Sequence, residues 1–286
     1  MKNILVTGGN GQLGSSLKVI SKDYSDYKLF FTDYEELDIT SQKATSNYLD
    51  TQEFFAIINC AAYTAVDKAE NDYDKAELLN SIAPKYLAIE AEKRGIGLIH
   101  ISTDYVFGNT KNTPIQPLDK DTNPNSAYGK TKLEGEKNIQ ENVSSYIIIR
   151  TAWLYSEFGG NFVKTMIRLG KEKESINVVY DQVGSPTFAY DLAISIMECL
   201  NYLTSETKMI LHYTNEGVCS WYDFAKKIME LEGINCKVNP ILSKEFSSPA
   251  PRPSYSVLDK QPIKDYLSIE IPHWEDSLKK CLKRLK

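Results

Sequence analysis

Tyr128 and Lys132 are the residues in this chain whose types and spacing best suit chemistry. The segment from Ser126 to about Asn142 is rich in Lys, Glu and Leu, which predicts a helix capped by Asn125 or Ser126. Residues four apart lie on one face of a helix. An ammonium beside a phenol favours the phenolate and lowers its pKa from about 10. We therefore expect Tyr128 to be a general acid or base, although such pairs also occur by chance in helices.

A glycine turn near the N-terminus is the first element that would bring a ligand to this pair. The β-rich run from Asn3 to Thr7 leads into Gly8-Gly9-Asn10-Gly11-Gln12-Leu13-Gly14 and then a helical pattern. Glycines at this spacing permit a tight turn, close approach of a pyrophosphate and packing of the helix on the strand. The helix N-terminus adds free N–H groups and a positive dipole end. The residues expected to bind a dinucleotide, unless this is a plain turn, are Gly8, Gly11, Gln12, Leu13 and Gly14.

Asp33 ends a second predicted strand, Lys28–Thr32, about 20 residues beyond the last glycine. A carboxylate at this place binds the hydroxyls of the adenosine ribose and repels a 2′-phosphate. No arginine occurs in the glycine turn or directly after Asp33, so these residues favour NADH. The alternative is an Asp that is simply solvated at the surface. We expect Asp38 to lie near the adenine.

Two further predicted strands end in segments suited to ligand binding. The apolar run Phe54–Cys60 leads into the small residues that begin at Ala61, and Gly97–Ser102 leads into Ser102–Gly108. Open α/β sheets bind ligands at the carboxyl ends of their buried parallel strands. Strands alternate with helices as far as residue 150, which predicts an α/β fold with a Rossmann-type, doubly wound parallel sheet.

Beyond Arg150 the alternation of strands and helices changes. A strand predicted at Met209–Thr214 can rejoin the first sheet, whereas the segments around it do not continue the pattern. We expect residues 1–151 with 188–216 to form an NAD(P)-binding Rossmann domain. Residues 152–187 with 217–286 are then a smaller α/β substrate domain, interleaved with the first in the C-terminal half and placed to cover a ligand.

Composition excludes several classes of protein. The 286 residues carry a formal net charge of −5 with no basic field, so we expect no nucleic-acid partner. No apolar run approaches the ~20 residues of a membrane span, and no signal peptide is indicated, so we expect a cytoplasmic protein without a membrane partner. The five cysteines and three histidines are scattered, which indicates neither a disulfide framework nor a metal site.

The motifs together resemble a known family. The glycine turn, the stretch Ser102–Phe107 and the Tyr128-x-x-x-Lys132 pair are similar to those of the extended short-chain dehydrogenase/reductases. Further segments resemble the dTDP-4-dehydrorhamnose reductase family, over essentially the whole chain: Ala61–Asp67, Trp153, Asn161–Met166, Asp181–Thr187 and Arg252-Pro253. The resemblance implies NAD(P)H-dependent reduction of the C4 ketone of dTDP-4-dehydro-β-L-rhamnose to dTDP-L-rhamnose, the last step of making this precursor of cell-surface polysaccharides.

The resemblance also implies residue roles. Tyr128 donates a proton to O4 of the sugar, Lys132 lowers the pKa of Tyr128 and binds the nicotinamide ribose, and Thr103 hydrogen-bonds the reacting oxygen. The residues implied on the nicotinamide side are Ala62, Tyr63 and Thr64. The residues implied to bind the substrate, besides Thr103, are Asp104, Trp153, Asn161, Lys164 and Arg252. Asp104 can instead cap its turn, Trp153 can be a core residue, and Lys164 can be a solvated helix residue.

Several alternatives remain open from the sequence. The family commonly takes NADPH and some members use either coenzyme, so with Asp33 we expect dual use of NADPH and NADH. Bound Mg²⁺, and a monomer or a homodimer, stay undecided. A nucleotide-sugar 4-epimerase, or a reductase of another 4-keto sugar, would share these motifs. A non-catalytic regulatory subunit of the same fold would have no need of the set Thr103, Tyr128 and Lys132.

Overall fold

A parallel sheet of six strands forms the centre of the molecule, in the order β10-β5-β4-β3-β1-β2. The computed structural model describes all residues from 1 to 286. The strands are β1 (Lys2–Thr7), β2 (Tyr27–Thr32), β3 (Ala56–Asn59), β4 (Gly97–Thr103), β5 (Tyr146–Thr151) and β10 (Lys208–His212). Every neighbouring pair runs parallel, including β10 beside β5, so the predicted Rossmann-type sheet is confirmed.

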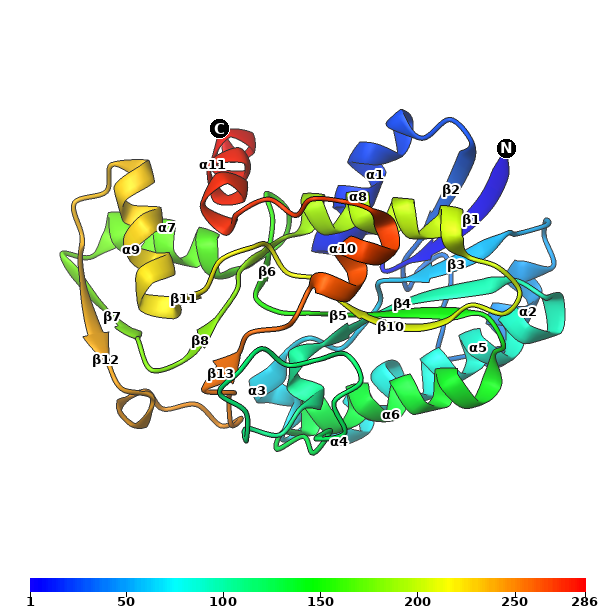
Figure 1. The fold of residues 1–286 in the computed structure, drawn as a ribbon, viewed down its shortest axis with the longest axis horizontal. Coiled ribbons are helices and arrows are strands. Elements are labelled where there is room, and N and C mark those ends of the chain that lie inside the picture. Colours follow the sequence, from blue (N-terminus) through cyan, green and yellow to red (C-terminus); the bar gives the residue numbers. More distant parts are fainter.

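Helices cover both faces of this sheet (Figure 1), which is why β3 and β5 are buried and apolar along almost their whole length. The helices on one face are α1 (Gln12–Ile20), α8 (Ala189–Cys199) and α10 (Gln261–Leu267). The helices on the other face are α2 (Gln42–Leu49), α5 (Ala83–Arg94) and α6 (Ala127–Asn142). The side chains of each layer form a separate apolar core with the strands.

The chain between β3 and α5 is built around Pro84. After α3 (Val66–Ala69) and α4 (Tyr73–Glu77), the helix widens into a π-helical turn, Leu78–Ile82, and α5 then begins with Pro84 in its first turn. Proline is tolerated there because that turn has no intrahelical use for its missing N–H. Single π turns inside helices are frequent at functional sites.

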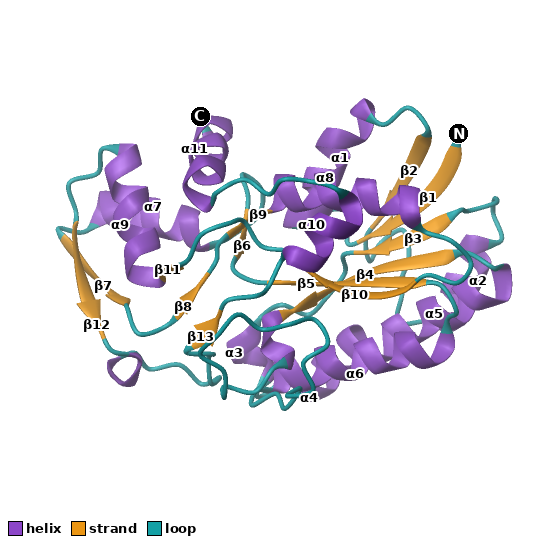
Figure 2. Cartoon of the chain, viewed as in Figure 1, coloured by secondary structure: helices purple, strands orange, loops and turns teal.

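A smaller unit, drawn at the left of Figure 2, follows β5. Its helices are α7 (Phe162–Glu172), α9 (Trp221–Glu232) and α11 (Trp274–Leu285). Its strands form three small sheets: β7 (Ser175–Val179) with β12 (Lys237–Ile241); β8 (Val183–Gly184) with β11 (Cys219–Ser220) and β13 (Tyr255–Ser256); and β6 (Leu154–Tyr155) with β9 (Thr187–Phe188). These elements share a core of their own, rich in aromatic residues.

The packing refines the division of the chain that the sequence suggests. Phe188 belongs to the core of the small unit and Ala189 to that of the large one, so the chain passes from one core to the other at this point. Ile263 and Leu267 of α10, however, join the core that α1 and α8 form on the large sheet. The segment 217–286 therefore contributes to both cores.

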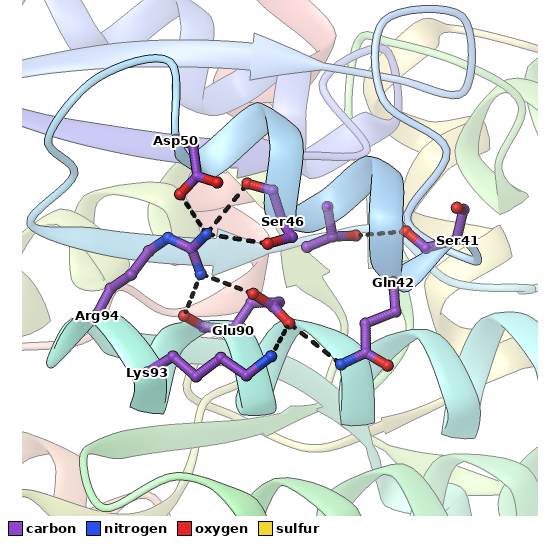
Figure 3. A network of polar contacts seen from close by, with 8 residues as sticks. Ser41, Gln42, Ser46, Asp50, Glu90, Lys93 and Arg94 are labelled. Atoms are coloured by element: carbon purple, nitrogen blue, oxygen red, sulfur yellow. Dashed lines mark hydrogen bonds and ion pairs between the residues drawn. The ribbon is translucent and has the colours of Figure 1, made fainter.

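A polar network ties α2 to α5 on the outer side of their layer (Figure 3). The buried carboxylate of Glu90 accepts hydrogen bonds from Lys93 (2.7 Å), Arg94 (2.7 Å) and Gln42 (3.1 Å). Arg94 also donates to Asp50 (2.5 Å) and to the end of α2. Burial alone would raise the pKa of Glu90, but the hydrogen bonds lower it to about 2.

Candidate active site

A cavity of about 670 Å³ opens at the carboxyl edge of the large sheet. It lies where the strand order reverses between β1 and β3, the point at which open α/β sheets bind ligands. The predicted residues that line it are Gly8, Gly11, Gln12, Leu13, Gly14, Asp33, Asp38, Ala62, Thr64, Thr103, Asp104, Tyr128, Lys132, Trp153 and Asn161. The predicted residues Tyr63, Lys164 and Arg252 are not among those that line it.

The glycine turn forms a cradle that larger residues would fill. Gly8 has φ +68°, and a Cβ at this position would lie 2.7 Å from the backbone nitrogen of Ala61. A Cβ on Gly14 would overlap the Gly8 carbonyl oxygen, and a Cβ on Gly11 would lie 3.3 Å from the same oxygen, a tight contact. No side chain caps α1, and its first turn holds no acidic residue, so its first N–H groups remain available to an anion. This cradle fits the pyrophosphate of a dinucleotide.

Asp33 lies in the cavity at the end of β2, half-buried and held by two backbone N–H groups. Its carboxylate accepts from Asn10 (3.1 Å) and from Tyr34 (2.9 Å), which fixes it beside the glycine turn. Asp38 accepts from the backbone N–H and the hydroxyl of Thr40. Lys132 is the only cationic residue that lines the cavity, so no lysine or arginine near Asp33 offers charge to a 2′-phosphate.

Tyr128 stands in the first turn of α6, where the predicted cap is confirmed. The Ser126 hydroxyl accepts from the N–H of Gly129 at 3.1 Å and starts the helix. A Cβ on Gly129 would overlap the carbonyl oxygen of Tyr105, so this glycine lets the helix approach the segment after β4. Burial raises the pKa of Tyr128, and Thr103 only partly opposes this effect. Tyr128 therefore carries its proton at neutral pH.

Thr103 and Asp104 form one hydrogen-bonded unit at the end of β4. The Thr103 hydroxyl donates to Asp104 Oδ1 at 2.9 Å and accepts from the N–H of Tyr105 at 3.2 Å. The other oxygen of Asp104 accepts from Ser256 on β13, which belongs to the small unit. Burial raises the pKa of Asp104 to about 6 although these hydrogen bonds act in the opposite direction. Asp104 thus orients Thr103 and links the two units.

Lys132 is buried at the floor of the cavity with a 1 % exposed fraction. Its Nζ donates to the carbonyl oxygen of Ile101 at 2.7 Å and lies 3.2 Å from Nε2 of His100. Burial lowers the pKa of Lys132 to about 8, against the opposite effect of Glu136. Lys132 is not among the groups that shift the pKa of Tyr128 in this structure. The amine is directed at β4, and burial dominates the pKa of the phenol.

The π-helical turn positions the backbone beside the cavity. The Asn80 side chain accepts from the N–H of Tyr63 (2.8 Å) and donates to its carbonyl oxygen (3.1 Å) and to Thr131 of α6 (3.2 Å). The Tyr63 hydroxyl donates to Asp72, away from the cavity. Asn80 therefore fixes the segment that presents Ala62 and Thr64 to the cavity.

Trp153 lies at the rim of the cavity in an unusual backbone conformation. Its φ is 51°, a left-handed value that is rare for a bulky residue and points to a functional constraint. Its indole stacks on Trp221 with ring centroids 3.6 Å apart and planes 10° apart. Gly184 makes room for it, because a Cβ there would come within 2.9 Å of the indole. Trp153 therefore forms part of the cavity wall, and Trp221 supports it from outside the lining.

Asn161 and Lys164 contribute to structure more than to open binding surface. Asn161 caps α7 by accepting from the N–H of Lys164 (3.2 Å), and it donates to Gln12 on α1 (2.9 Å) and to the Ser156 carbonyl oxygen (2.8 Å). Its side chain therefore ties the small unit to the glycine turn. Lys164 is half-buried on α7, outside the cavity lining.

Arg252 reaches across from the small unit toward the sheet. It pairs with Asp67 at 2.7 Å and donates to Ser248 at 3.2 Å, and one of its nitrogens lies 3.5 Å from the Tyr105 hydroxyl. The pair joins the proline-rich loop to α3, beside the cavity. In this arrangement Arg252 is occupied by a carboxylate, so binding of a diphosphate would require it to exchange partners.

Comparison with known proteins relates this cavity to a family. The family model described as RmlD substrate binding domain matches residues 1–286. The chain belongs to this family. The resemblance found in the motifs is thereby confirmed, and the chain is an NAD(P)-dependent reductase of the 4-keto-sugar nucleotide class.

Relatives of this RmlD-family chain match it end to end. The crystal structure of a dTDP-4-dehydrorhamnose reductase from Clostridium acetobutylicum is 43% identical with a TM-score of 0.93, over 99% of both chains. That from Bacillus anthracis, in complex with NADP, is 38% identical with a TM-score of 0.94, over 99% of this chain and 100% of that one. The spore coat polysaccharide biosynthesis protein SpsK of Bacillus subtilis is 38% identical over 99% of this chain and 97% of its own.

Sequence reasoning missed several residues of the RmlD-family site. Asn59 and His100 line up behind Lys132, Asn80 supports the coenzyme side, Trp221 backs Trp153, and Ser256 holds Asp104. A signal existed for Asn59 and His100, since each is a polar residue inside an apolar, buried strand, and such groups must find partners. Trp221 and Ser256 come from distant segments and gave no local signal.

The RmlD-family chain has neither a cluster of metal-ligating side chains nor a helix suited to a membrane. No group of three or more His, Cys, Asp or Glu side chains is arranged to hold a metal ion. None of the helices combines the length and the apolar character that crossing a lipid bilayer requires.

Proposed function

We propose that this chain reduces the C4 ketone of dTDP-4-dehydro-β-L-rhamnose to dTDP-L-rhamnose, with NADPH or NADH as coenzyme. The observation that carries the proposal is the convergence of Thr103, Tyr128 and Lys132 on one cavity whose other end is the glycine cradle. A hydride donor bound along the cradle and a ketone beside Tyr128 would then meet at the carboxyl edge of the sheet.

The reduced nicotinamide supplies the hydride, and the protein must supply the proton. Tyr128 is suited to this because burial raises its pKa and keeps it protonated until the ketone oxygen becomes an alkoxide. Lys132, with a pKa of about 8, then returns a proton to the Tyr128 phenolate. Near neutral pH the free energy of each proton transfer is therefore favourable or close to zero.

Thr103 stabilises the charge that develops on the oxygen. Its hydroxyl donates to Asp104 at 2.9 Å and must turn toward the substrate oxygen as negative charge appears there. A donor aimed at such charge in a water-poor site is worth about 3 to 4 kcal/mol. The Trp153 indole would pack on the sugar or the base, and Arg252, released from Asp67, would pair with the diphosphate.

The coenzyme proposal weighs two observations. Asp33 is held at the ribose position without a cationic neighbour in the cavity, which disfavours a 2′-phosphate. A relative 38% identical was nevertheless crystallised with NADP. Dual use reconciles them, because a carboxylate that is only half-buried weakens binding of a phosphate at the ribose without excluding it.

The deciding experiment follows oxidation of NADPH and of NADH at the nicotinamide absorbance, with dTDP-4-dehydro-β-L-rhamnose generated in situ by the enzymes that precede this step. Oxidation that requires the protein and yields dTDP-L-rhamnose supports the proposal and ranks the coenzymes. Absence of oxidation by a protein that binds coenzyme contradicts it. The same assay on other dTDP-4-keto sugars then tests a second substrate, because a relative 40% identical is named a probable dTDP-4,6-dihydroxy-2-methyloxan-3-one 4-ketoreductase.

An epimerase of the same fold is separated by a simple observation. An epimerase retains its nicotinamide and returns the hydride, so it would purify with bound coenzyme and interconvert sugars without net oxidation. We expect the purified protein to need added coenzyme for each turnover. Interconversion of a nucleotide sugar at catalytic amounts of coenzyme would replace the reductase proposal.

A further inference from the structure

A row of buried polar side chains lies beneath Lys132. Thr7, Asn59 and His100 stand directly opposite one another on the adjacent strands β1, β3 and β4. All three have exposed fractions of 1 % or less, as has Lys132 at the end of the row. Polar groups buried to this degree require defined hydrogen-bond partners, so their protonation can be worked out from the geometry.

The orientation of the Asn59 amide is fixed by the backbone. Asn59 Oδ1 accepts from the N–H of Ala61 at 3.1 Å and from the Thr7 hydroxyl at 2.7 Å. A backbone N–H can only donate, so this atom must be the amide oxygen. The amide nitrogen then faces Nδ1 of His100 at 3.0 Å and donates to it. His100 Nδ1 is therefore an acceptor and carries no hydrogen.

This acceptor role decides the form of the His100 ring. Burial lowers the pKa of His100, and Lys132 acts in the same direction, so the ring is neutral. A neutral ring without a hydrogen on Nδ1 carries it on Nε2. Nε2 lies 3.2 Å from Lys132 Nζ, so its N–H points at the lysine nitrogen. An ammonium has no lone pair to accept this bond, whereas a neutral amine has one.

We propose that His100 is a positioning residue for the reduction, which donates its Nε2–H to the neutral amine of Lys132, and that Asn59 fixes the tautomer on which this donation depends. The other hydrogen bond of the amine, to the Ile101 carbonyl oxygen at 2.7 Å, is one that either form of Lys132 can donate. The row thus favours the neutral form of Lys132 through the single contact with the His100 Nε2–H. This inference deepens the proposed function and rests on it for its catalytic meaning.

The proposal has a definite place in the proton balance. Tyr128 gives its proton to the oxygen of the reduced sugar and becomes a phenolate. The Lys132 ammonium gives a proton to that phenolate and becomes an amine, which the His100 N–H then stabilises. A proton from solvent restores the ammonium before the next turnover, and His100 keeps its own proton throughout. The row therefore favours proton release from Lys132 at the step where Tyr128 needs it.

The other groups around Lys132 act in the opposite direction. Burial lowers the pKa of Lys132 to about 8, and Glu136, one turn further along α6, acts in the opposite direction. Glu136 is itself bound by Arg150 of β5 at 2.6 Å. Burial raises the pKa of the Cys60 thiol to about 12, so it stays neutral beside the lysine. Tyr128, on the same helix, also stays neutral until it gives up its proton.

The first test reads the tautomer of His100 directly. Nitrogen-15 NMR of histidine-labelled protein without added coenzyme separates protonated from unprotonated ring nitrogens, and comparison with His100→Gln identifies the signals among the three histidines. We expect an unprotonated Nδ1 and a protonated Nε2 from about pH 6 to about pH 9. A hydrogen on Nδ1, as tautomer or imidazolium, would overturn the proposal.

The second test measures the pKa of Lys132 by carbon-13 NMR of its Cε, identified with Lys132→Met. His100→Leu removes the N–H donor, so we expect the pKa to rise by about one unit, a tenfold change in proton affinity. His100→Gln keeps an N–H donor and should restore most of the shift. The matched control is His212→Gln, since His212 is equally buried but bonds to the Ile115 carbonyl oxygen. An unchanged pKa in a folded His100→Leu variant contradicts the proposal.

Asn59→Asp keeps the shape of the site and tests the proposal even if His100→Leu does not fold. In Asn59→Asp one oxygen still accepts from Ala61, but the other must receive a hydrogen from Nδ1, which turns Nε2 into an acceptor. We expect the pKa of Lys132 to rise further than in His100→Leu, and an unchanged value again refutes the proposal. These measurements need no sugar, so they stand even where the sugar assay fails, and they can fail where that assay succeeds.

Discussion

At the scale of single residues, the site suits a reductase because its tyrosine begins the reaction with a proton. Burial keeps Tyr128 protonated, which is the form that must act when a ketone oxygen gains charge. A pKa lowered to neutrality would have left a mixture of forms. Lys132, whose pKa falls to about 8, is the group placed near neutrality instead.

Removal of the Tyr128 hydroxyl should separate chemistry from binding. In Tyr128→Phe we expect kcat to fall by about 10²- to 10⁴-fold, because the general acid is lost, with the Kd of the coenzyme nearly unchanged. Steady-state kinetics and a coenzyme titration measure the two effects. The control is Tyr146→Phe, a buried tyrosine at the opposite edge of the sheet. Turnover of Tyr128→Phe near that of the control would remove Tyr128 from the reaction.

Asp33 should govern the choice of coenzyme. In Asp33→Ala we expect the ratio of kcat/KM for NADPH to that for NADH to rise about tenfold, because repulsion of the 2′-phosphate and a ribose hydrogen bond are both lost. Glu35→Ala removes the same charge from an exposed neighbour outside the cavity and serves as the control. Equal ratios in the two variants would place the ribose elsewhere.

Residues whose function depends on local spacing were accessible from the sequence. The glycine turn, Asp33 and the pair Tyr128 and Lys132 line the cavity as expected, because each is fixed by one turn or one helix. The direction in which Lys132 points was not accessible, since it depends on His100 from another strand. The pairing of Arg252 with Asp67 was not accessible either, because Asp67 lies 185 positions away in the chain.

At the scale of elements, a network of ion pairs and hydrogen bonds centred on Glu90 holds α2 and α5 together (Figure 3). Its pKa of about 2 lies below the ordinary value of a glutamate, so the ionised form is the one that the fold stabilises. Such stabilisation is complete above the pKa of the unfolded chain, about 4.3, and is lost as the pH falls toward the pKa of the folded protein.

Glu90→Gln should therefore destabilise the protein at neutral pH and flatten its acid dependence. We expect a lower free energy of unfolding at about pH 7 than in the parent, with the difference shrinking between about pH 4.3 and pH 2. Urea unfolding at several pH values measures this. Glu134→Gln is the matched control, because the Glu134 side chain is 53% exposed and its ion pair with Lys137 contributes little to stability. A constant difference across that pH range would contradict the assignment.

Element boundaries show where sequence patterns stop being sufficient. The alternation of strands and helices predicted the parallel sheet and a late strand, β10, that can rejoin it, because buried parallel strands have a distinctive apolar pattern. The pattern did not reveal that α10 packs with α1 and α8. An amphipathic pattern shows that a helix has an apolar face. It does not show which of two cores that face packs into.

At the scale of the whole molecule, several polar contacts between the large and the small unit lie at the cavity. Asn161 with Gln12, Ser256 with Asp104, and Arg252 with Asp67 are such contacts, and each involves a residue on or beside the cavity. A ligand that replaced one of them would therefore also change how the units are held together.

Arg252 provides the test at this scale. If it leaves Asp67 to bind the diphosphate, Arg252→Ala should raise KM for the nucleotide sugar about 10- to 100-fold, since a charged hydrogen bond is worth about 1.5 to 3 kcal/mol, and leave coenzyme binding intact. Asp67→Asn should not raise this KM, because Arg252 remains. Arg168→Ala, at an exposed helix pair, is the control. An equal increase in Asp67→Asn and Arg252→Ala would assign the pair to fold stability alone.

The stacked indoles of Trp153 and Trp221 also provide an intrinsic optical probe of the site. Indoles stacked 3.6 Å apart couple electronically, and where their in-plane transition dipoles are skewed the coupling gives paired bands of opposite sign in far-ultraviolet circular dichroism. Of the three tryptophans only Trp274 lies outside this pair, packed edge-on against Phe224. A sugar that slid against Trp153 and shifted it from its partner would weaken the coupled bands. Substrate docking would then be visible before any coenzyme is consumed.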